Sequence, residues 1–129
     1  DYFRDIAIIV ADKKLMYTEA IDYRSSKYIE VGKEGFYCGN PNNQLFLNFH
    51  GRVSGLDGQF LLINNFAWPG SSGSIVFNKE GRVIGALSAV SVDAPTGLPV
   101  LIPHIVRVGP TLNYTRKFIL EALKDDTGN

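Results

Sequence analysis

Cysteine is almost absent from this chain, because Cys38 is the one cysteine among 129 residues. A single cysteine forms no disulfide within the chain, so that source of stability is excluded and the redox compartment stays open. Together with the two histidines, His50 and His104, it also lacks the number and spacing of ligands that a zinc site needs. The sequence therefore predicts no metal and no cofactor. Because Cys38 lies in an apolar run, we expect it to pack as a small hydrophobic side chain and not to act as a nucleophile.

An excess of charge of either sign is also missing, since Lys plus Arg and Asp plus Glu number 13 each. This balance provides no field that attracts nucleic acid or an anionic membrane surface, so neither is expected as a partner. No run of 18 apolar residues occurs, and no basic segment precedes the first apolar run. The sequence predicts neither a membrane-spanning helix nor a signal peptide, and it leaves the localisation undetermined. The chain begins with Asp1 in place of Met, which indicates a processed or truncated product.

Short apolar runs bounded by Gly, Pro, Asn or Asp make up most of the chain. They cover residues 5–10, 36–38, 45–56, 59–67, 74–78, 82–92 and 99–108. Their lengths and spacing are typical of strands in an all-β barrel or sandwich. The segment "KEG" at 79–81 has the length and chemistry of a tight hairpin turn. Only residues 113–126 place their apolar side chains on one face of a helix.

One stretch combines many small residues with an apolar run: "WPGSSGSIV", residues 68–76. Glycines and serines in this number are typical of a turn. The same composition suits a loop whose backbone N–H groups converge on one point, because glycine has no Cβ to restrict the backbone. A serine in such a loop becomes a nucleophile when a base accepts its proton and the donors stabilise an oxyanion. The loop alone leaves both interpretations open.

Five segments in order resemble trypsin-like serine proteases, and in particular their HtrA-type members. "RDIAIIV" is similar to the strand that carries the catalytic aspartate of the family, and "VGKEGFYCGNPNN" to a later segment that ends in Gly-Asn-Pro. "HGRVSGLDGQFLLINNFAWPGSSGS" follows the course of the family into its nucleophile loop. The hairpin segment "SIVFNKEGRVIGALSAV" and the strand "LPVLIPHIV" complete the series. Each motif alone is common, but five in this order are specific.

The resemblance implies an all-β fold, a chymotrypsin-like Greek-key β-barrel. Residues 1–10 would form the last strand of the first barrel and residues 11–32 the connector between the barrels. Residues 33–109 would form the second β-barrel, and residues 110–129 a C-terminal α-helix and tail. In the family the general-base histidine precedes the catalytic aspartate. It would therefore lie on an N-terminal barrel segment outside this chain, in the same precursor or in a separate chain.

The resemblance also implies which residues carry the chemistry. Ser72 matches the catalytic nucleophile, and the backbone N–H groups of Gly70, Ser71 and Ser72 match the oxyanion hole. Asp5 matches the carboxylate that orients the histidine; the alternative is a surface aspartate paired with Arg4. Neither His50 nor His104 matches the catalytic position, so both are expected to be structural or surface side chains.

Substrate recognition is implied for two further segments. Phe66 matches the base of the primary specificity pocket, where it provides no acid for an Arg or Lys side chain. Residues Ser88, Ala89 and Val90 match the strand that pairs with a polypeptide substrate, and Ser88 also matches the serine that bonds the catalytic aspartate. We expect a small or medium apolar residue at the cleaved position. The alternative for Phe66 is simple packing against the barrel.

Two functions of different class follow from these residues. In the first, the chain is the C-terminal part of a serine endopeptidase. In the second, it is a non-catalytic trypsin-like binding or structural module that has no base. The presence of both Asp5 and Ser72 favours the first, because an inactive site has no chemical need for both. In either case we expect an apolar face that the N-terminal barrel segment covers.

Overall fold

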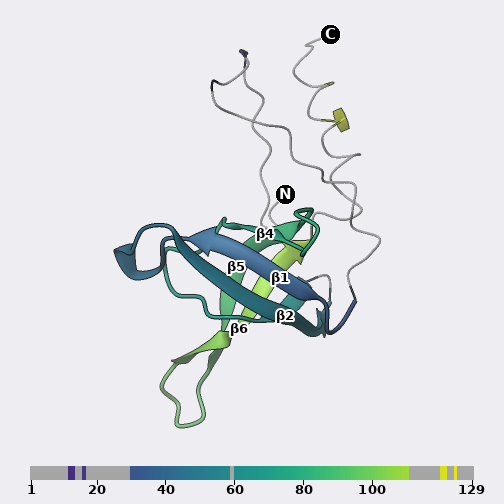
Figure 1. Cartoon of the computed structure of the whole chain (residues 1–129). Coiled ribbons are helices and arrows are strands. Elements are labelled where there is room, and N and C mark those ends of the chain that lie inside the picture. Colours follow the sequence, from purple (N-terminus) through teal and green to yellow (C-terminus); the bar gives the residue numbers. More distant parts are fainter. Residues whose placement is uncertain are drawn as a thin grey trace.

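The computed structural model describes residues 12–13, 16, 30–58, 60–110, 120–121 and 124. Six antiparallel strands within this part form a closed barrel in the order β1-β2-β3-β6-β5-β4 (Figure 1). The strands are β1 (Glu34–Gly39), β2 (Leu47–Asp57), β3 (Phe60–Asn64), β4 (Ile75–Phe77), β5 (Val83–Asp93) and β6 (Val100–Pro110). A short 3₁₀ segment, η2 (Pro41–Asn43), follows β1. The fold is thus all-β, and the predicted barrel is confirmed.

The strand order is that of a Greek key. The first three strands are consecutive neighbours, and β6 then lies between β3 and β5. Short β4 closes the barrel by pairing with both β1 and β5. Beyond the rest of the barrel, β5 and β6 extend as a two-stranded hairpin in which Val92 pairs with Leu101 (Figure 1). Closure leaves few strand edges exposed, which protects a small sheet from pairing with other chains.

Alternation of side chains along the strands explains where the core lies. In β1 the burial alternates at every residue from Gly35 to Gly39, because successive side chains point to opposite faces of a strand. The core is aliphatic apart from one tyrosine. It consists of Tyr37, Val53, Leu61, Ile63, Ala67, Val76, Ile84, Leu87, Val106 and Val108.

Glycines permit close approach of backbone at two places in the wall. A Cβ on Gly51 in β2 would collide with the carbonyl oxygen of Asn64, and a Cβ on Gly85 in β5 would collide with that of Gly109. Neither glycine has a positive φ, so close contact and not backbone conformation requires them. By contrast, a Cβ on Gly55, also in β2, would meet nothing within 4 Å.

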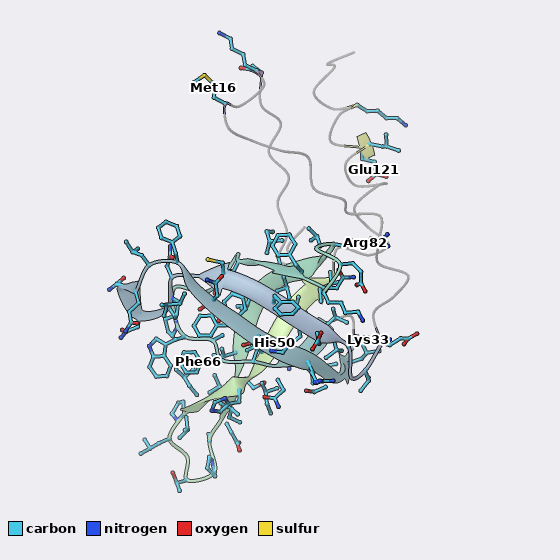
Figure 2. The ribbon with its side chains drawn as sticks, in the orientation of Figure 1. Met16, Lys33, His50, Phe66, Arg82 and Glu121 are labelled. Atoms are coloured by element: carbon cyan, nitrogen blue, oxygen red, sulfur yellow. The ribbon has the colours of Figure 1, made fainter. Side chains whose placement is uncertain are left out.

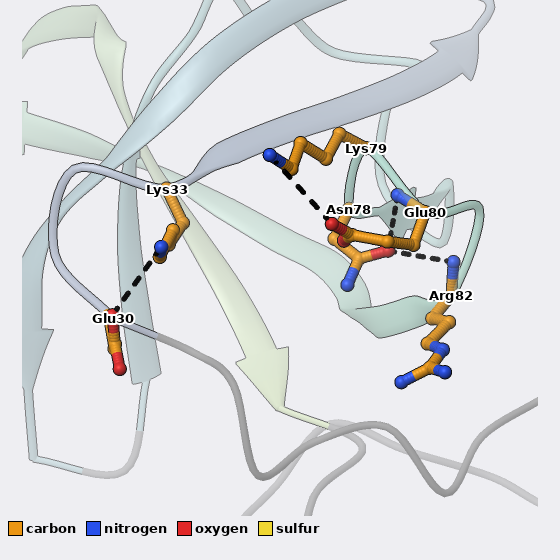
Figure 3. A network of polar contacts seen from close by, with 6 residues as sticks. All are labelled: Glu30, Lys33, Asn78, Lys79, Glu80 and Arg82. Carbon is orange, nitrogen blue, oxygen red and sulfur yellow. Dashed lines mark hydrogen bonds and ion pairs between the residues drawn. The ribbon is translucent and has the colours of Figure 1, made fainter.

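The turn between β4 and β5 is held by Asn78. Its Oδ1 accepts the backbone N–H groups of Glu80, at 3.1 Å, and Arg82, at 2.9 Å (Figure 3). Its own backbone N–H donates to the carbonyl of Arg82 at 2.8 Å, and Gly81 has a φ of +73°. These bonds satisfy the backbone N–H and C=O groups that have no partner in the sheet where the chain reverses. The hairpin predicted at 79–81 is present.

The remaining predicted elements lie mostly outside the described residues. Residues 1–10, the predicted strand of a first barrel, are among them, so the proposed division of the chain stays a prediction. Of the predicted C-terminal helix, Leu120, Glu121 and Lys124 are helical and the other residues lie outside the described part. No helix within the described residues is long and apolar enough to cross a membrane.

Gly51→Ala in the full-length protein tests the close approach of β2 to Asn64. Because the added Cβ has no room, we expect the free energy of unfolding to fall by about 1–3 kcal/mol. Gly55→Ala is the matched control in the same strand, with an expected change within about 0.5 kcal/mol. Denaturant unfolding measures both, and an equal effect of the two substitutions would contradict the explanation.

Candidate active site

Two consecutive turns shape the loop between β3 and β4. The N–H of Ser71 donates to the carbonyl of Trp68 at 2.9 Å, and the N–H of Ser74 donates to that of Ser71 at 3.1 Å. The loop then joins β5 through a reciprocal pair of bonds, from Gly73 N to Leu87 O at 2.7 Å and from Leu87 N to Ser74 O at 2.8 Å. Serine and glycine suit such turns because they tolerate the required backbone angles and supply local hydrogen bonds. The loop is therefore fixed to the barrel on the β5 side.

Ser72 lies at the exposed crest of this loop. Its side chain faces solvent, and its Oγ donates to the carbonyl of Ser88 in β5 at 3.3 Å. That distance is at the long end for a hydroxyl donor, so the bond is weak and readily exchanged. An accessible, weakly bonded hydroxyl is the state in which a serine can transfer its proton to a base.

Gly70 occupies a position that no other residue type fits. Its φ is +103°, a conformation that side-chain-bearing residues rarely adopt, and a Cβ there would lie 2.5 Å from the carbonyl oxygen of Asn40. The segment that contains Asn40 also contacts Pro69, whose carbonyl accepts the N–H of Asn42 at 3.0 Å. Both the bend and the close approach therefore depend on the absence of a side chain at position 70.

The backbone donors of the loop divide into two groups. The N–H of Ser71 is occupied by the carbonyl of Trp68. The N–H groups of Gly70 and Ser72 donate to no backbone carbonyl within residues 30–58 and 60–110. Of the three predicted oxyanion donors, Gly70 and Ser72 therefore have no backbone acceptor within the described residues, whereas Ser71 has one.

An open strand edge lies beside Ser72. Pairing of β5 with β4 ends at Ala86, whereas pairing with β6 continues to Asp93. Among the described residues, no strand covers the second edge of β5 from Ala89 onward. An extended peptide can add to such an edge through main-chain hydrogen bonds. Ala89 is exposed and Val90 is half-buried, so this part of β5 is accessible from outside.

Several predicted site residues are not joined to this group. Asp5 lies outside the described residues. His50 in β2 is exposed, stacks on Phe36 with ring centroids 4.6 Å apart, and lies 3.5 Å from a carboxylate oxygen of Glu34. His104 in β6 is exposed as well. Neither histidine forms a hydrogen bond with Ser72 within the described part, so both lie where surface side chains were expected.

Comparison with known families decides the relationship. A family model described as a trypsin-like peptidase domain matches residues 1–85, about two thirds of the chain, including the loop with Ser72. The chain belongs to the trypsin-like peptidase family. A comparison with curated proteins finds no match.

Aromatic side chains connect the core of this peptidase domain to its surface near the loop. Phe49 stacks on Tyr37 at a centroid distance of 4.9 Å and on Phe66 at 5.7 Å. Phe66 in turn lies parallel to Trp68 at 6.5 Å and meets the edge of His104 at 6.2 Å. Phe66 and Trp68 are each 38% exposed, so neither is buried in the core. Figure 2 shows Phe66 at the opposite side of the barrel from Lys33.

A hollow of about 280 Å³ adjoins this aromatic group. It is mainly apolar and is lined by Pro41, Asn42, Gln44, Leu47, Phe66 and Trp68. No residue of the predicted substrate strand at 88–90 lines it. Among the described residues, Phe66 and this strand therefore do not share one hollow.

A second hollow, of about 670 Å³, is lined by none of the residues of the loop between β3 and β4. Its lining combines four cations and three carboxylates, and each carboxylate is in contact with a cation: Glu30 with Lys33, Glu34 with Arg52, and Glu80 with Lys79 (Figure 3 shows the first and the last pair). Mixed charge of this kind neutralises itself and gives no selectivity for an anionic ligand. Within the described residues, no group of His, Cys, Asp and Glu is placed to hold a metal ion.

Cys38 corrects one expectation. Its side chain is exposed on the outer face of β1, although packing against the core was expected. The reason is register: Tyr37 and Gly39 point inward, and the residue between them must point outward. The apolar run alone does not show which face of the strand a residue occupies.

Tyr37 is the residue near the site that the sequence did not indicate. It is 2% exposed, and its hydroxyl donates to the carbonyl of Phe66, 29 positions away. Burial raises the pKa of this hydroxyl above its ordinary value, and a hydrogen bond from the Ser71 side chain lowers it in part. A tyrosine in a strand predicts burial, but nothing local identifies so distant a partner.

Tyr37→Phe tests the effect of this buried hydroxyl on stability in alkali. Since the folded pKa is raised, the contribution is present below the unfolded value of about 10 and is lost as pH increases toward the folded value. We expect the melting temperature of the wild type to fall more steeply than that of the variant above about pH 10. Thermal melts at several pH values measure this, and parallel pH profiles would contradict the assignment.

Proposed function

We propose that the chain contributes the nucleophile and oxyanion hole of an HtrA-type serine endopeptidase. In this proposal a histidine on an N-terminal barrel segment is the general base, and Asp5 orients it. The proposal extends family membership to a specific reaction, the hydrolysis of peptide bonds. It needs no metal and no cofactor, because the serine mechanism uses only proton transfer and backbone donors.

The reaction assigns one role to each group. The base takes the proton of Ser72 as Oγ attacks the substrate carbonyl carbon, and the carbonyl oxygen becomes an oxyanion. The N–H groups of Gly70 and Ser72 donate to that oxyanion. The protonated base then gives its proton to the leaving amine, and water releases the acyl group by the same steps in reverse. Each oxyanion donor is typically worth about 3 kcal/mol of transition-state stabilisation.

The observation that carries the proposal is the pairing of an exposed Ser72 with two unused N–H groups in a loop bent at Gly70. A turn that only connects β3 and β4 does not need a glycine with a φ of +103° so close to the carbonyl of Asn40. The bend at Gly70 is explained if it orients the N–H groups of the loop toward one point.

The open edge of β5 supports a polypeptide as the substrate. Ser88 accepts the Ser72 hydroxyl at 3.3 Å, so a peptide paired with residues 88–90 would pass next to the nucleophile. Val90, on this edge, brings no charge to the site, which favours a small or medium apolar residue at the cleaved position; Phe66 lines a separate hollow and supports this preference only through the resemblance. A peptide library with a strong preference for Arg or Glu would contradict this specificity.

Labelling of the full-length protein with a fluorophosphonate probe tests the reaction. We expect a covalent adduct on Ser72, located by mass spectrometry, and none in the Ser72→Ala variant. Ser71→Ala is unsuitable as the control because Ser71 contacts the same loop; Ser54→Ala, an exposed serine on β2, is suitable and should label like the wild type. Unlabelled Ser72 in a folded full-length protein would instead support the non-catalytic module.

Gly70→Ala tests the oxyanion hole separately from the nucleophile. Because the Cβ would force the loop away from Asn40, we expect the labelling rate to fall by about 100- to 1000-fold. Gly97→Ala is matched to it, since Gly97 has a φ of +81° but open space around its Cα. That control should strain the backbone without affecting labelling. Equal rates for the two variants would contradict the role of Gly70.

A further inference from the structure

Ser71, the residue immediately before Ser72, is a buried polar side chain. It is 1% exposed, whereas its neighbour Ser72 faces solvent. A hydroxyl removed from water without partners is costly, so such a group is expected to be hydrogen-bonded. The Ser71 hydroxyl accepts a long hydrogen bond, 3.5 Å, from the N–H of Trp68, and its proximity to Tyr37 lowers the pKa of that buried hydroxyl in part, against the larger effect of burial.

The chemistry of the partners fixes the direction of these bonds. The carbonyl of Phe66 can only accept, so the Tyr37 hydroxyl must donate its proton there. The oxygen of Tyr37 is then left to accept, and the Ser71 hydroxyl is the neighbouring side chain that can donate to it. Tyr37 therefore holds the Phe66 end of the segment 66–71, while Ser71 is bonded to Trp68 within the same segment.

Tyr37 is suited to hold this segment because it is itself fixed. It lies in the middle of β1, is paired with Phe49 on β2 and Val76 on β4, and stacks on Phe49 with an interplanar angle of 22°. Gly39 in the same strand leaves room for the arrangement, since a Cβ there would lie 3.0 Å from the Tyr37 ring and 2.7 Å from Ser74 Oγ.

Phe66 shows why hydrogen bonds from side chains are needed to fix residues 66–71. It lies between β3 and the nucleophile loop and takes no part in the sheet. Its N–H donates to Oδ1 of Asn65 at 2.8 Å, and its carbonyl accepts from Tyr37. Both backbone groups are thus satisfied by side chains, so removal of the Tyr37 hydroxyl leaves a carbonyl without its partner in a half-buried position.

We infer that Tyr37 and Ser71 are positioning residues, whose buried hydroxyls, bonded to Phe66 and Trp68, hold residues 66–71 in the conformation that presents the Gly70 and Ser72 N–H groups to an oxyanion. The inference rests on the proposed function for its catalytic consequence. Neither residue is proposed to contact the substrate. They act through the backbone, on a loop that is otherwise attached to η2 by the bond from Asn42 N to Pro69 O and to β5 by Gly73.

The test compares Tyr37→Phe, Ser71→Ala and the double variant in the full-length protein. Phenylalanine keeps the ring and its stack on Phe49, so only the hydroxyl is lost. We expect kcat and the fluorophosphonate labelling rate to fall by about 10- to 100-fold while KM changes little, because a displaced donor acts on the transition state. The double variant should lose no more than about the larger single effect, since the two hydroxyls act as one unit.

Val53→Ala is the control for stability. Val53 is a core residue of β2, 2% exposed, and it is not one of the two positioning residues. It should lower the melting temperature to a similar extent and leave kcat unchanged. Wild-type kcat in a folded Tyr37→Phe variant, or a fall in kcat of Val53→Ala equal to that of Tyr37→Phe, would overturn the inference while the labelling of Ser72 still supported the proposed function.

An NMR measurement covers the case in which the wild type itself does not react. Amide shifts and hydrogen exchange of Gly70 and Ser72 are recorded in the wild type and in Tyr37→Phe. A change at both amides, with Gly97 unchanged as an internal reference, supports the positioning of the loop by Tyr37 even if the proposed function fails. Unchanged amides at positions 70 and 72 would overturn it.

Discussion

The structure depends on one tight contact, that of Gly70 with the carbonyl of Asn40. There a Cβ would approach the carbonyl oxygen to 2.5 Å, and the φ of +103° excludes most other residues independently. The bend places Ser72 at an exposed crest while Ser71, one residue earlier, is buried. Two consecutive turns, closed by Ser71 N to Trp68 O and Ser74 N to Ser71 O, produce this change of burial. The contact at Gly70 allows these turns.

The closed barrel fixes this bend through hydrogen bonds to three separate elements. Tyr37 of β1 donates to the carbonyl of Phe66, Asn42 of η2 donates its N–H to the carbonyl of Pro69, and Gly73 donates its N–H to the carbonyl of Leu87 in β5. Three supports on separate strands and turns make the loop rigid without a disulfide or a metal. Preorganised donors are effective because they need no rearrangement when charge develops. The architecture of the trypsin-like domain thus supports the proposed chemistry, because it keeps the N–H donors in place.

The sequence predicted the strands well because their signals are local. Alternating or continuous apolar runs between Gly, Pro and Asn mark β2 and β5, and "KEG" marks the turn that Asn78 completes. The order of the strands, and the position of the small-residue loop, followed only from the resemblance to a family. The partnership of Tyr37 with Phe66 and Ser71 was not predicted, because it joins residues 29 and 34 positions apart and depends on the register of β1 with β4. The exposure of Cys38 was missed for the same reason, since register decides which face a residue occupies.

The central claim is that the loop forms an oxyanion hole around the Ser72 hydroxyl. A crystal structure of the full-length protein with a peptidyl boronate tests it most directly, because boron bonded to a serine oxygen imitates the tetrahedral intermediate. We predict a bond from boron to Ser72 Oγ and one boronate oxygen within about 2.7–3.1 Å of the backbone nitrogens of Gly70 and Ser72. A boronate bound elsewhere, or one on Ser72 whose oxygens all face solvent, would contradict the account.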